Sequence, residues 1–163
     1  MKDVKNMKTK KSAIIIAMII VLVLGLALYD QTISTEYSPA DDEIALHIKL
    51  DTKEDIGLLV FDYLVDDHEY SGGISNANKS LIKNDSDNIQ VWNKHELNSS
   101  SAAVELSIRL RIITEYMTPN YENIYPEDIT RYIDPISWKA YFGNSYFITI
   151  TGNKLSGYKA VLN

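Results

Sequence analysis

Hydrophobic positions along this chain form one unbroken run near the N-terminus and short alternating stretches further on. Residues 13–29 read AIIIAMIIVLVLGLALY, with no charged side chain and no polar stripe. The hydrocarbon core of a bilayer requires an apolar helix of about 17–25 residues, whereas a helix on the surface of a globular domain keeps one polar face. The run therefore predicts a single membrane-spanning helix.

The charges on the two sides of this run differ in sign. The leader, residues 1–12, carries five lysines and one aspartate, whereas the first charged side chains after the run are Asp30 and Glu36. Because positive flanks stay on the cytoplasmic side, we predict a cytoplasmic N-terminus and a C-terminal part outside the cell membrane. A cleaved secretory signal is the alternative. Its apolar core is usually shorter, about 7–15 residues, and a cut would fall inside this run, so an uncleaved signal anchor is favoured.

From residue 43 onward, apolar residues alternate with polar ones, which is the period of a β-strand with one buried face. In 104–112, aliphatic side chains fall on one face and polar ones such as Glu105 and Arg111 on the other. The stretch 58–65 (LLVFDYLV) is apolar on both faces and predicts a central strand, with Asp62 on its wetter face. Further strands are predicted at 44–50, 81–82, 89–93, 136–142, 146–151 and 158–162.

Polar segments separate these strands. We expect a polar loop over 66–79, hairpin turns at 143–144 and 152–157, and a long crossing segment over 114–135. Within that segment, Pro126 followed by two acidic residues predicts a short helix reaching Tyr132, because proline suits the first helical position and acids the first turn.

The spacing of short strands, without helix–strand alternation, resembles that of immunoglobulin-like domains. It predicts an all-β ectodomain, an antiparallel sandwich of about seven or eight strands, after one transmembrane helix. The predicted organisation is a basic cytoplasmic leader (1–12), a transmembrane signal anchor (13–29), a polar tether (30–42) and a β-sandwich domain (43–163).

Composition narrows the function classes. The part after the apolar run has ten more acidic than basic side chains, and nucleic-acid binding depends on the opposite balance, so we predict no nucleic-acid partner. The chain has no cysteine, which excludes disulfides, thiol catalysis and cysteine-ligated metals. Its richness in Ile, Asn and Lys is typical of an AT-rich bacterial genome. No nucleophile elbow, zinc-protease helix, P-loop or dinucleotide fingerprint occurs, so we predict that the protein is not an enzyme.

Two acidic turns are the candidate metal ligands. One contains Asp66, Asp67 and Glu69, and the other contains Asp85 and Asp87. Calcium takes six to eight oxygen ligands, often from loops, so two such turns at the same end of a sandwich would suit it. The spacing matches no EF-hand, and a solvated pair of turns is the plainer interpretation.

Four tyrosines, Tyr116, Tyr121, Tyr125 and Tyr132, crowd the crossing segment and are the candidate partner-binding residues. Aromatic side chains on loops anchor interfaces, although the same rings also fix long loops to a sandwich. We therefore predict a noncatalytic module that binds an unidentified protein partner. The alternative is a small-ligand domain for calcium or a cell-wall glycan, and an enzyme is the remote alternative.

Overall fold

The computed structural model of the chain describes residues 37–118 and 124–163. The predicted leader, the predicted membrane anchor and residues 30–36 of the tether lie outside the described residues. Within the described part, there is no helix with the length and apolar character that a membrane crossing needs.

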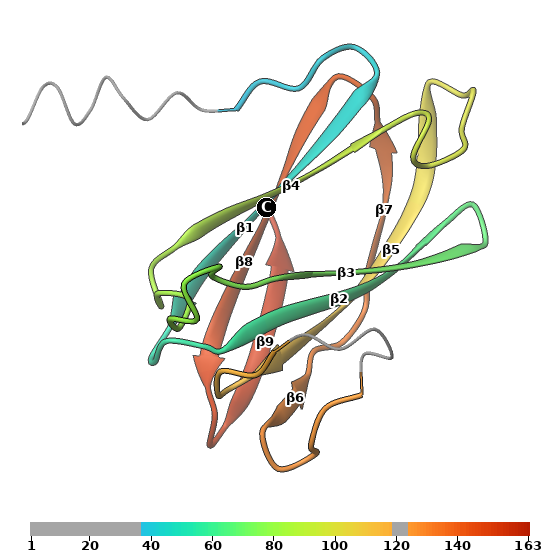
Figure 1. Ribbon diagram of the computed structural model, residues 1–163. Helices are drawn as coiled ribbons and strands as arrows, with labels where there is room; N and C mark the ends of the chain where they lie inside the picture. The colour runs from blue at the N-terminus through green and yellow to red at the C-terminus, as the bar shows by residue number, and fades with distance from the viewer. Residues whose placement is uncertain (1–36, 119–123) are drawn as a thin grey trace, which may run out of the picture. The chain divides into compact units, whose positions relative to one another are not determined.

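Residues Ser38–Asn163 form one compact unit that is built from two β-sheets (Figure 1). The first sheet has the order β4-β1-β8-β9, with bounds Asp87–Asn93, Glu43–Thr52, Asn144–Asn153 and Gly157–Leu162. The second has the order β3-β2-β5-β6, with bounds His68–Ile74, Leu58–Val65, Ala103–Ile113 and Thr130–Tyr132. Strand β7 (Ile136–Tyr141) also pairs with β5. The described pairs of strands are antiparallel except β1 and β8, which run parallel.

The core lies between the two sheets and is made by the alternating aliphatic residues. Strand β1 contributes Ile44, Leu46, Ile48 and Leu50, each fully buried, and β5 contributes five aliphatic side chains of the same face. Burying each large aliphatic side chain stabilises the fold by about 1.5–3 kcal/mol relative to exposure. The prediction of an all-β domain is confirmed, and β1, β2, β4, β5, β7, β8 and β9 lie where the sequence predicts strands. The strand predicted at 81–82 is only an isolated bridge between Ile82 and Ile56.

The prediction of a polar loop over 66–79 is wrong in its first half, which is strand β3. Asp66 and Asp67 have φ values of 46° and 70°, as in the two-residue turn that joins twisted hairpin strands. Val65 therefore pairs with His68, and β3 continues along β2. Gly72, which suggests a loop in the sequence, packs against Phe61, because a Cβ there would lie 2.5 Å from its ring.

Two further local predictions are wrong. The short helix expected from Pro126 is a single turn, in which the Thr130 N–H donates to the Glu127 carbonyl at 3.2 Å, and β6 follows at once. The turn at Gly143 does not close a hairpin. Instead, it carries the chain from β7 in the second sheet to β8 in the first, with the Gly143 N–H donating to the Glu43 carbonyl at 2.7 Å. The β8–β9 hairpin is confirmed.

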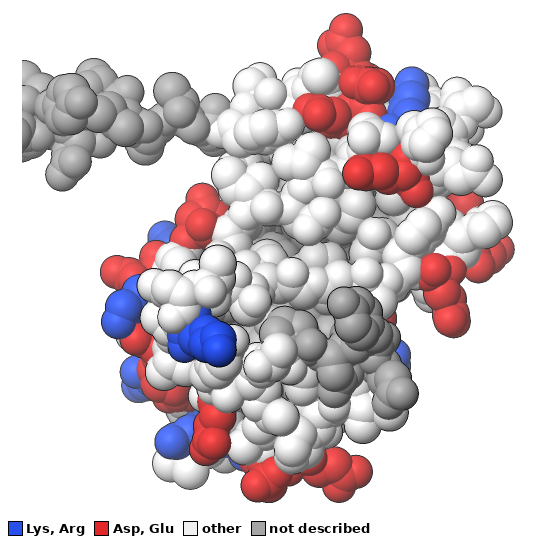
Figure 2. Space-filling model, viewed as in Figure 1, with Lys and Arg blue, Asp and Glu red and all other residues white. Residues whose placement is uncertain are grey.

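The outward face of the first sheet holds a buried histidine, although it stands at a position that alternates with the core residues of β1. His47 is only 3% exposed, because its ring stacks on Phe147 with centroids 4.6 Å apart. Its Nδ1 lies 3.5 Å from a carboxylate oxygen of Asp87. Elsewhere on the surface, Figure 2 shows acidic side chains spread around the margins of one face and an uncharged area in its middle.

Candidate functional site

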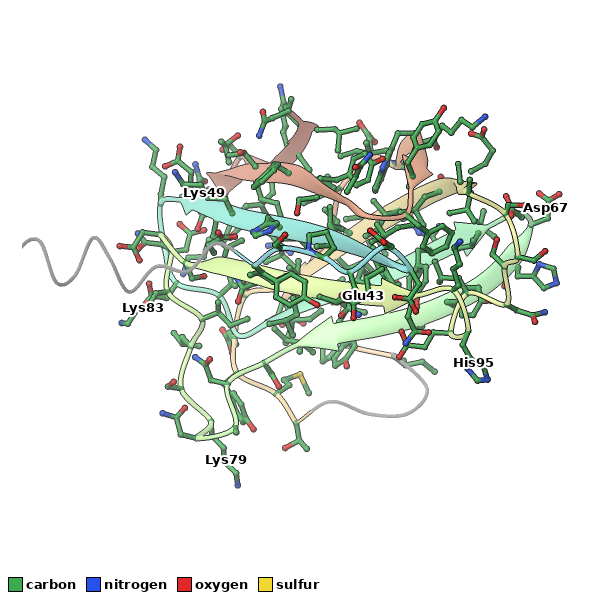
Figure 3. All side chains as sticks on the ribbon, turned by 90° about the horizontal axis from the view of Figure 1, so that it is seen from above. Glu43, Lys49, Asp67, Lys79, Lys83 and His95 are labelled. Atoms are coloured by element: carbon green, nitrogen blue, oxygen red, sulfur yellow. The ribbon has the colours of Figure 1, made fainter. Side chains whose placement is uncertain are left out.

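The structure does not bring the two predicted acidic turns together. Asp66 and Asp67 form the turn between β2 and β3, whereas Asp87 pairs with Lys49 near the far end of β1. Figure 3 shows Asp67 and Lys49 at opposite ends of the sandwich. Among residues 37–118 and 124–163, no three metal-ligating side chains are grouped closely enough to hold an ion. Calcium binding thus remains a prediction from sequence alone.

The four predicted tyrosines do not form one surface. Tyr125 is 9% exposed and packs in a small apolar cluster with Leu58, Val60 and Ile113, so it fixes the crossing segment to the sheet. Tyr116 is half-buried, and Tyr121 lies outside the described residues. Tyr132 is 64% exposed. Tyr132 is the one among the three described that offers most of its ring to a partner.

The crossing segment covers one half of the outward face of β2 and leaves the other half open. Outward-pointing side chains on β2 are Leu58, Val60, Asp62 and Leu64, and the first two are buried beneath Tyr125. The segment passes so close at its start that a Cβ on Gly57 would lie 1.7 Å from the Glu115 carbonyl oxygen. The uncovered half, around Asp62, is hollowed.

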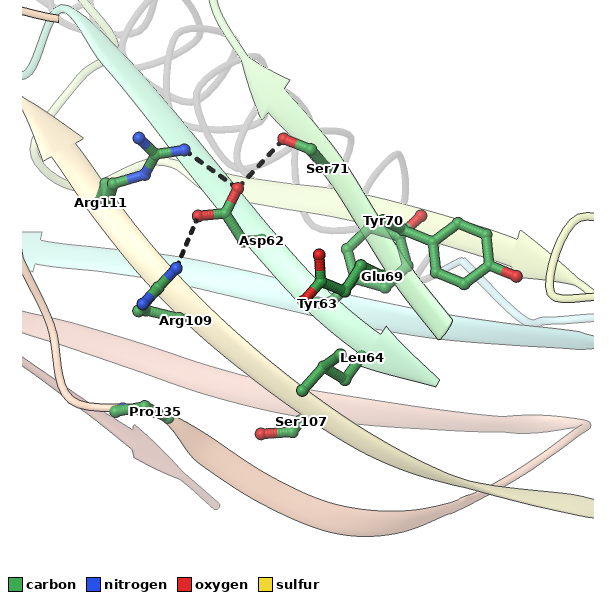
Figure 4. A pocket seen from close by; sticks show the side chains of 10 residues that line it. All are labelled: Asp62, Tyr63, Leu64, Glu69, Tyr70, Ser71, Ser107, Arg109, Arg111 and Pro135. Atoms are coloured by element: carbon green, nitrogen blue, oxygen red, sulfur yellow. Dashed lines mark hydrogen bonds and ion pairs between the residues drawn. The ribbon is translucent and has the colours of Figure 1, made fainter. Parts of the chain in front are cut away.

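This hollow has a volume of about 650 Å³ and lies on the outer face of the second sheet (Figure 4). Its lining residues are Asp62, Tyr63, Leu64, Glu69, Tyr70, Ser71, Ser107, Arg109, Arg111 and Pro135. The stacked rings of Tyr63 and Tyr70, with centroids 5.1 Å apart, belong to the other side of these strands and pack against the core.

Asp62 joins two arginines and a serine at the base of the hollow. Its register positions opposite Arg109 on β5 and Ser71 on β3 bring these side chains to the same face. One carboxylate oxygen accepts from Arg111 Nη2 at 3.0 Å and from Ser71 Oγ at 3.2 Å. The other oxygen lies 3.5 Å from Arg109 Nη2. Figure 4 shows Asp62 between the two guanidinium groups.

The two arginines differ in how far they are exposed. The Arg111 side chain is 11% exposed and that of Arg109 is 56% exposed. A guanidinium carries five N–H donors in a planar fork that matches carboxylate geometry. Asp62 thus contacts both guanidinium groups through one nitrogen each, and Arg109 stays widely open to solvent.

A second hollow of about 450 Å³ adjoins the first and shares Leu64 and Ser107 with it. It also touches the β2–β3 turn, where Asp66 accepts a hydrogen bond from the Glu105 N–H at 3.0 Å. Ser137 Oγ and Ser107 Oγ are hydrogen-bonded at 2.7 Å across β5 and β7. The two hollows together are called the outer groove below.

The arginines of the outer groove are not among the predicted site residues, although their spacing in the sequence places them on one face of a strand. The chain has only three arginines, and Arg109 and Arg111 stand two positions apart on a strand, hence on one face. Asp62 is the lone charge in an otherwise apolar strand. A charged acid on a central strand is expected to pair with a basic side chain on the neighbouring strand. The sequence does not show that β5 is the neighbour of β2, so it does not identify the arginines as the partners of Asp62.

No protein-family model matches the chain, and no curated protein matches it. Among solved structures, the chain is similar to a non-hemolytic pneumolysin from Streptococcus pneumoniae strain ST306, with a TM-score of 0.37, 9% identity, and coverage of 74% of this chain and 23% of that one. It is also similar to a disulfide-locked mutant of intermedilysin with human CD59, with a TM-score of 0.35, 12% identity, and coverage of 74% and 24%. The match spans about a quarter of the length of each of these proteins.

Proposed function

We propose that this protein is a noncatalytic interaction module that binds a protein partner through the outer groove. One observation supports the proposal above the others. Asp62 contacts both Arg111, by a hydrogen bond, and Arg109, by a longer ion pair, in an open hollow on a face whose other half is closed by apolar packing. Polar groups held in this way need no rearrangement on binding, which reduces the entropic cost of association.

The proposal includes the location that the sequence predicts. The apolar run at 13–29 anchors the chain in the cell membrane, with the N-terminus cytoplasmic and the domain outside. We also place the sandwich with immunoglobulin-like domains, on the spacing of its strands and turns.

Tyr132 extends the binding surface at the end of the groove nearest Arg111. The two residues are direct partners across β5 and β6, so their side chains share one face of the sheet. An exposed aromatic ring beside a guanidinium is the combination that protein interfaces favour at their centres.

A cell-wall glycan is the second candidate ligand. The Ser71 and Ser107 side chains at the groove offer hydroxyls, and the Tyr132 ring offers a face on which a sugar can stack. This candidate uses the same surface, so the same experiment separates it from the protein partner.

The test is site-directed photo-crosslinking of the full-length chain in its native membrane. A photoreactive residue at Leu64, in the groove, is expected to yield one crosslinked protein, and the same residue at Val161, on the first sheet, is expected to yield none. Adding R109Q should reduce the Leu64 product. Equal products from both positions, or a Leu64 product that R109Q leaves unchanged, would contradict the proposal. Retention on cell-wall polysaccharide without a crosslinked protein would favour the glycan.

A further inference from the structure

The outer groove changes sign along its length. At one end stand Arg109 and Arg111, with Asp62 between them. At the other end, the second hollow is lined by Asp66, Asp67 and Glu105. The two hollows share Leu64 and Ser107 in the middle, where Glu69, opposite Leu64 on β3, adds a carboxylate at the side of the groove.

The distance between the two charged ends follows from the geometry of β5. Glu105, Ser107 and Arg109 occupy alternate positions of this strand and therefore point to the same face. Arg109 lies four positions after Glu105, and a strand rises about 3.3 Å per residue, so their Cα atoms lie about 13 Å apart.

The positive end has donors to offer a ligand. Each arginine is bound to Asp62 through Nη2, and the Arg109 side chain is more than half exposed. Two guanidinium groups around Asp62 give a local excess of positive charge, which Glu69, in the same hollow beside Leu64, partly offsets. An incoming carboxylate meets Arg109 through the exposed part of its guanidinium.

The negative end keeps free acceptors after its internal contacts are made. Asp66 is engaged with the Glu105 backbone, whereas Asp67 and the Glu105 side chain are exposed. Glu69 lies opposite Leu64 on β3 and adds a third exposed carboxylate. Lys139, opposite Glu105 on β7, offsets one of these charges, and the end stays acidic.

We propose that the outer groove binds an extended peptide segment that carries a carboxylate side chain at one position and a lysine or arginine four positions away. In an extended chain, residues i, i+2 and i+4 point to one side at the same rise as β5. The carboxylate then lies on Arg109 and the basic side chain lies at Glu105 and Asp67. The residue midway between them is apolar and contacts Leu64, which is 40% exposed. This inference rests on the proposed function, since it names the ligand of the same groove.

The charges of this exposed groove affect which ligand binds more than they affect how tightly it binds. Exposed ion pairs contribute about 0.2–1 kcal/mol each, but like charges brought together are rejected. The structure therefore assigns a preference for zwitterionic segments over singly charged ones, rather than tight binding.

The test measures binding of short peptides to the full-length chain in detergent micelles by nuclear magnetic resonance shifts. The probe is acetyl-Glu-Thr-Val-Thr-Lys-amide, and its matched controls replace Glu by Gln, Lys by Gln, or both. The zwitterionic probe is expected to shift the signals of groove residues and to bind about 1.4- to fivefold more tightly than either singly charged control. R109Q should abolish the preference for Glu, and E105Q should abolish the preference for Lys. K49Q and D51N, which change exposed charges on β1, should abolish neither.

Equal binding of all four peptides, or no shift of groove signals at about 1 mM probe, overturns the inference. A zwitterion preference that survives both R109Q and E105Q also overturns it, because the charges responsible then lie elsewhere. The proposed function is judged separately by the Leu64 crosslink. A crosslink that depends on Arg109 but not on Glu105 keeps the groove as the binding surface and removes the zwitterionic ligand.

Discussion

The outward face of β2 is buried in its first half and open to solvent in its second half, although both halves belong to the same strand. Leu58 and Val60 are 1% exposed and lie under the crossing segment, whereas Asp62 and Leu64 line an open groove. The covered half is wholly aliphatic, whereas the open half combines Leu64 with the charged Asp62. The cover depends on Tyr125, which packs onto the first half.

This difference explains why β2 is apolar on both faces in the sequence. A strand has apolar side chains on both faces when other residues pack against each face. The second sheet has the core on one side and part of the crossing segment on the other. The covered half supplies stability, and the open half is free to carry charged groups.

The largest effect is expected from L58A, with L64A as its matched control on the same face of the same strand. Leu58 is 1% exposed, so L58A leaves a cavity and should lower the free energy of unfolding by about 2–5 kcal/mol. Leu64 is 40% exposed, and L64A should cost less than about 1 kcal/mol. Urea denaturation of the full chain, followed by fluorescence of the chain's two tryptophans, measures both. Similar costs for the two variants would show that the crossing segment does not seal the first half.

The next effect is expected from Y125A, with Y132A as its control within the same segment. Tyr125 is 9% exposed and Tyr132 is 64% exposed. Losing the buried ring should lower stability by about 1.5–3 kcal/mol, and losing the exposed ring should change it by no more than about 0.5 kcal/mol. The same denaturation experiment compares them. A larger loss from Y132A would mean that β6, rather than Tyr125, fixes the cover.

Much of the sandwich could be predicted from the sequence, because burial on one face imposes a period of two. Val104 to Ile112 and Ile44 to Leu50 show this period without interruption, and both are strands. The predictions failed where a residue type is compatible with two local structures. Gly72 allows close packing on Phe61 rather than a loop, and the acids after Pro126 lie in a single turn before β6 rather than in a helix.

The candidate site was less visible because it depends on pairing between distant strands. Asp62 and Arg111 stand 49 positions apart and meet only through the β2–β5 register. The predicted acidic turns failed to converge for the same reason, since the order of strands decides which turns share an end. Local sequence patterns identify faces of strands but not neighbours in a sheet.

A smaller effect is expected from D62N, which tests whether Asp62 holds the two arginines. The neutral amide cannot balance the guanidinium of Arg111, whose side chain is 11% exposed. We expect a loss of about 1–2 kcal/mol in the free energy of unfolding, less than for a fully buried pair because Arg109 is largely solvated. D51N, an exposed acid on β1, is the control in the same urea experiment. An unchanged midpoint for D62N would indicate that the arginines are positioned by the strand alone.

The smallest effect concerns an ion pair outside the groove, between Asp55 and Lys83, and it should appear only as a dependence on pH. Lys83 Nζ donates to Asp55 at 2.8 Å, and the Asn84 N–H donates to it at 3.0 Å. These bonds, Lys83 first, lower the pKa of Asp55 below its ordinary value of 3.8, and the same contact raises the pKa of Lys83 above 10.5. A lowered carboxyl pKa stabilises the fold above the ordinary value, and the contribution is lost as the pH falls through the lowered one. D55N should therefore be slightly less stable than the unmodified chain at pH 6 and equal to it in strong acid, well below pH 4. D128N, which removes an exposed acid, is the control.

The contribution of the Asp55–Lys83 ion pair to stability should also fade in strong base, above the raised pKa of Lys83. A D55N difference that stays constant from pH 6 into strong acid would mean that the carboxylate charge is not what joins these two loops.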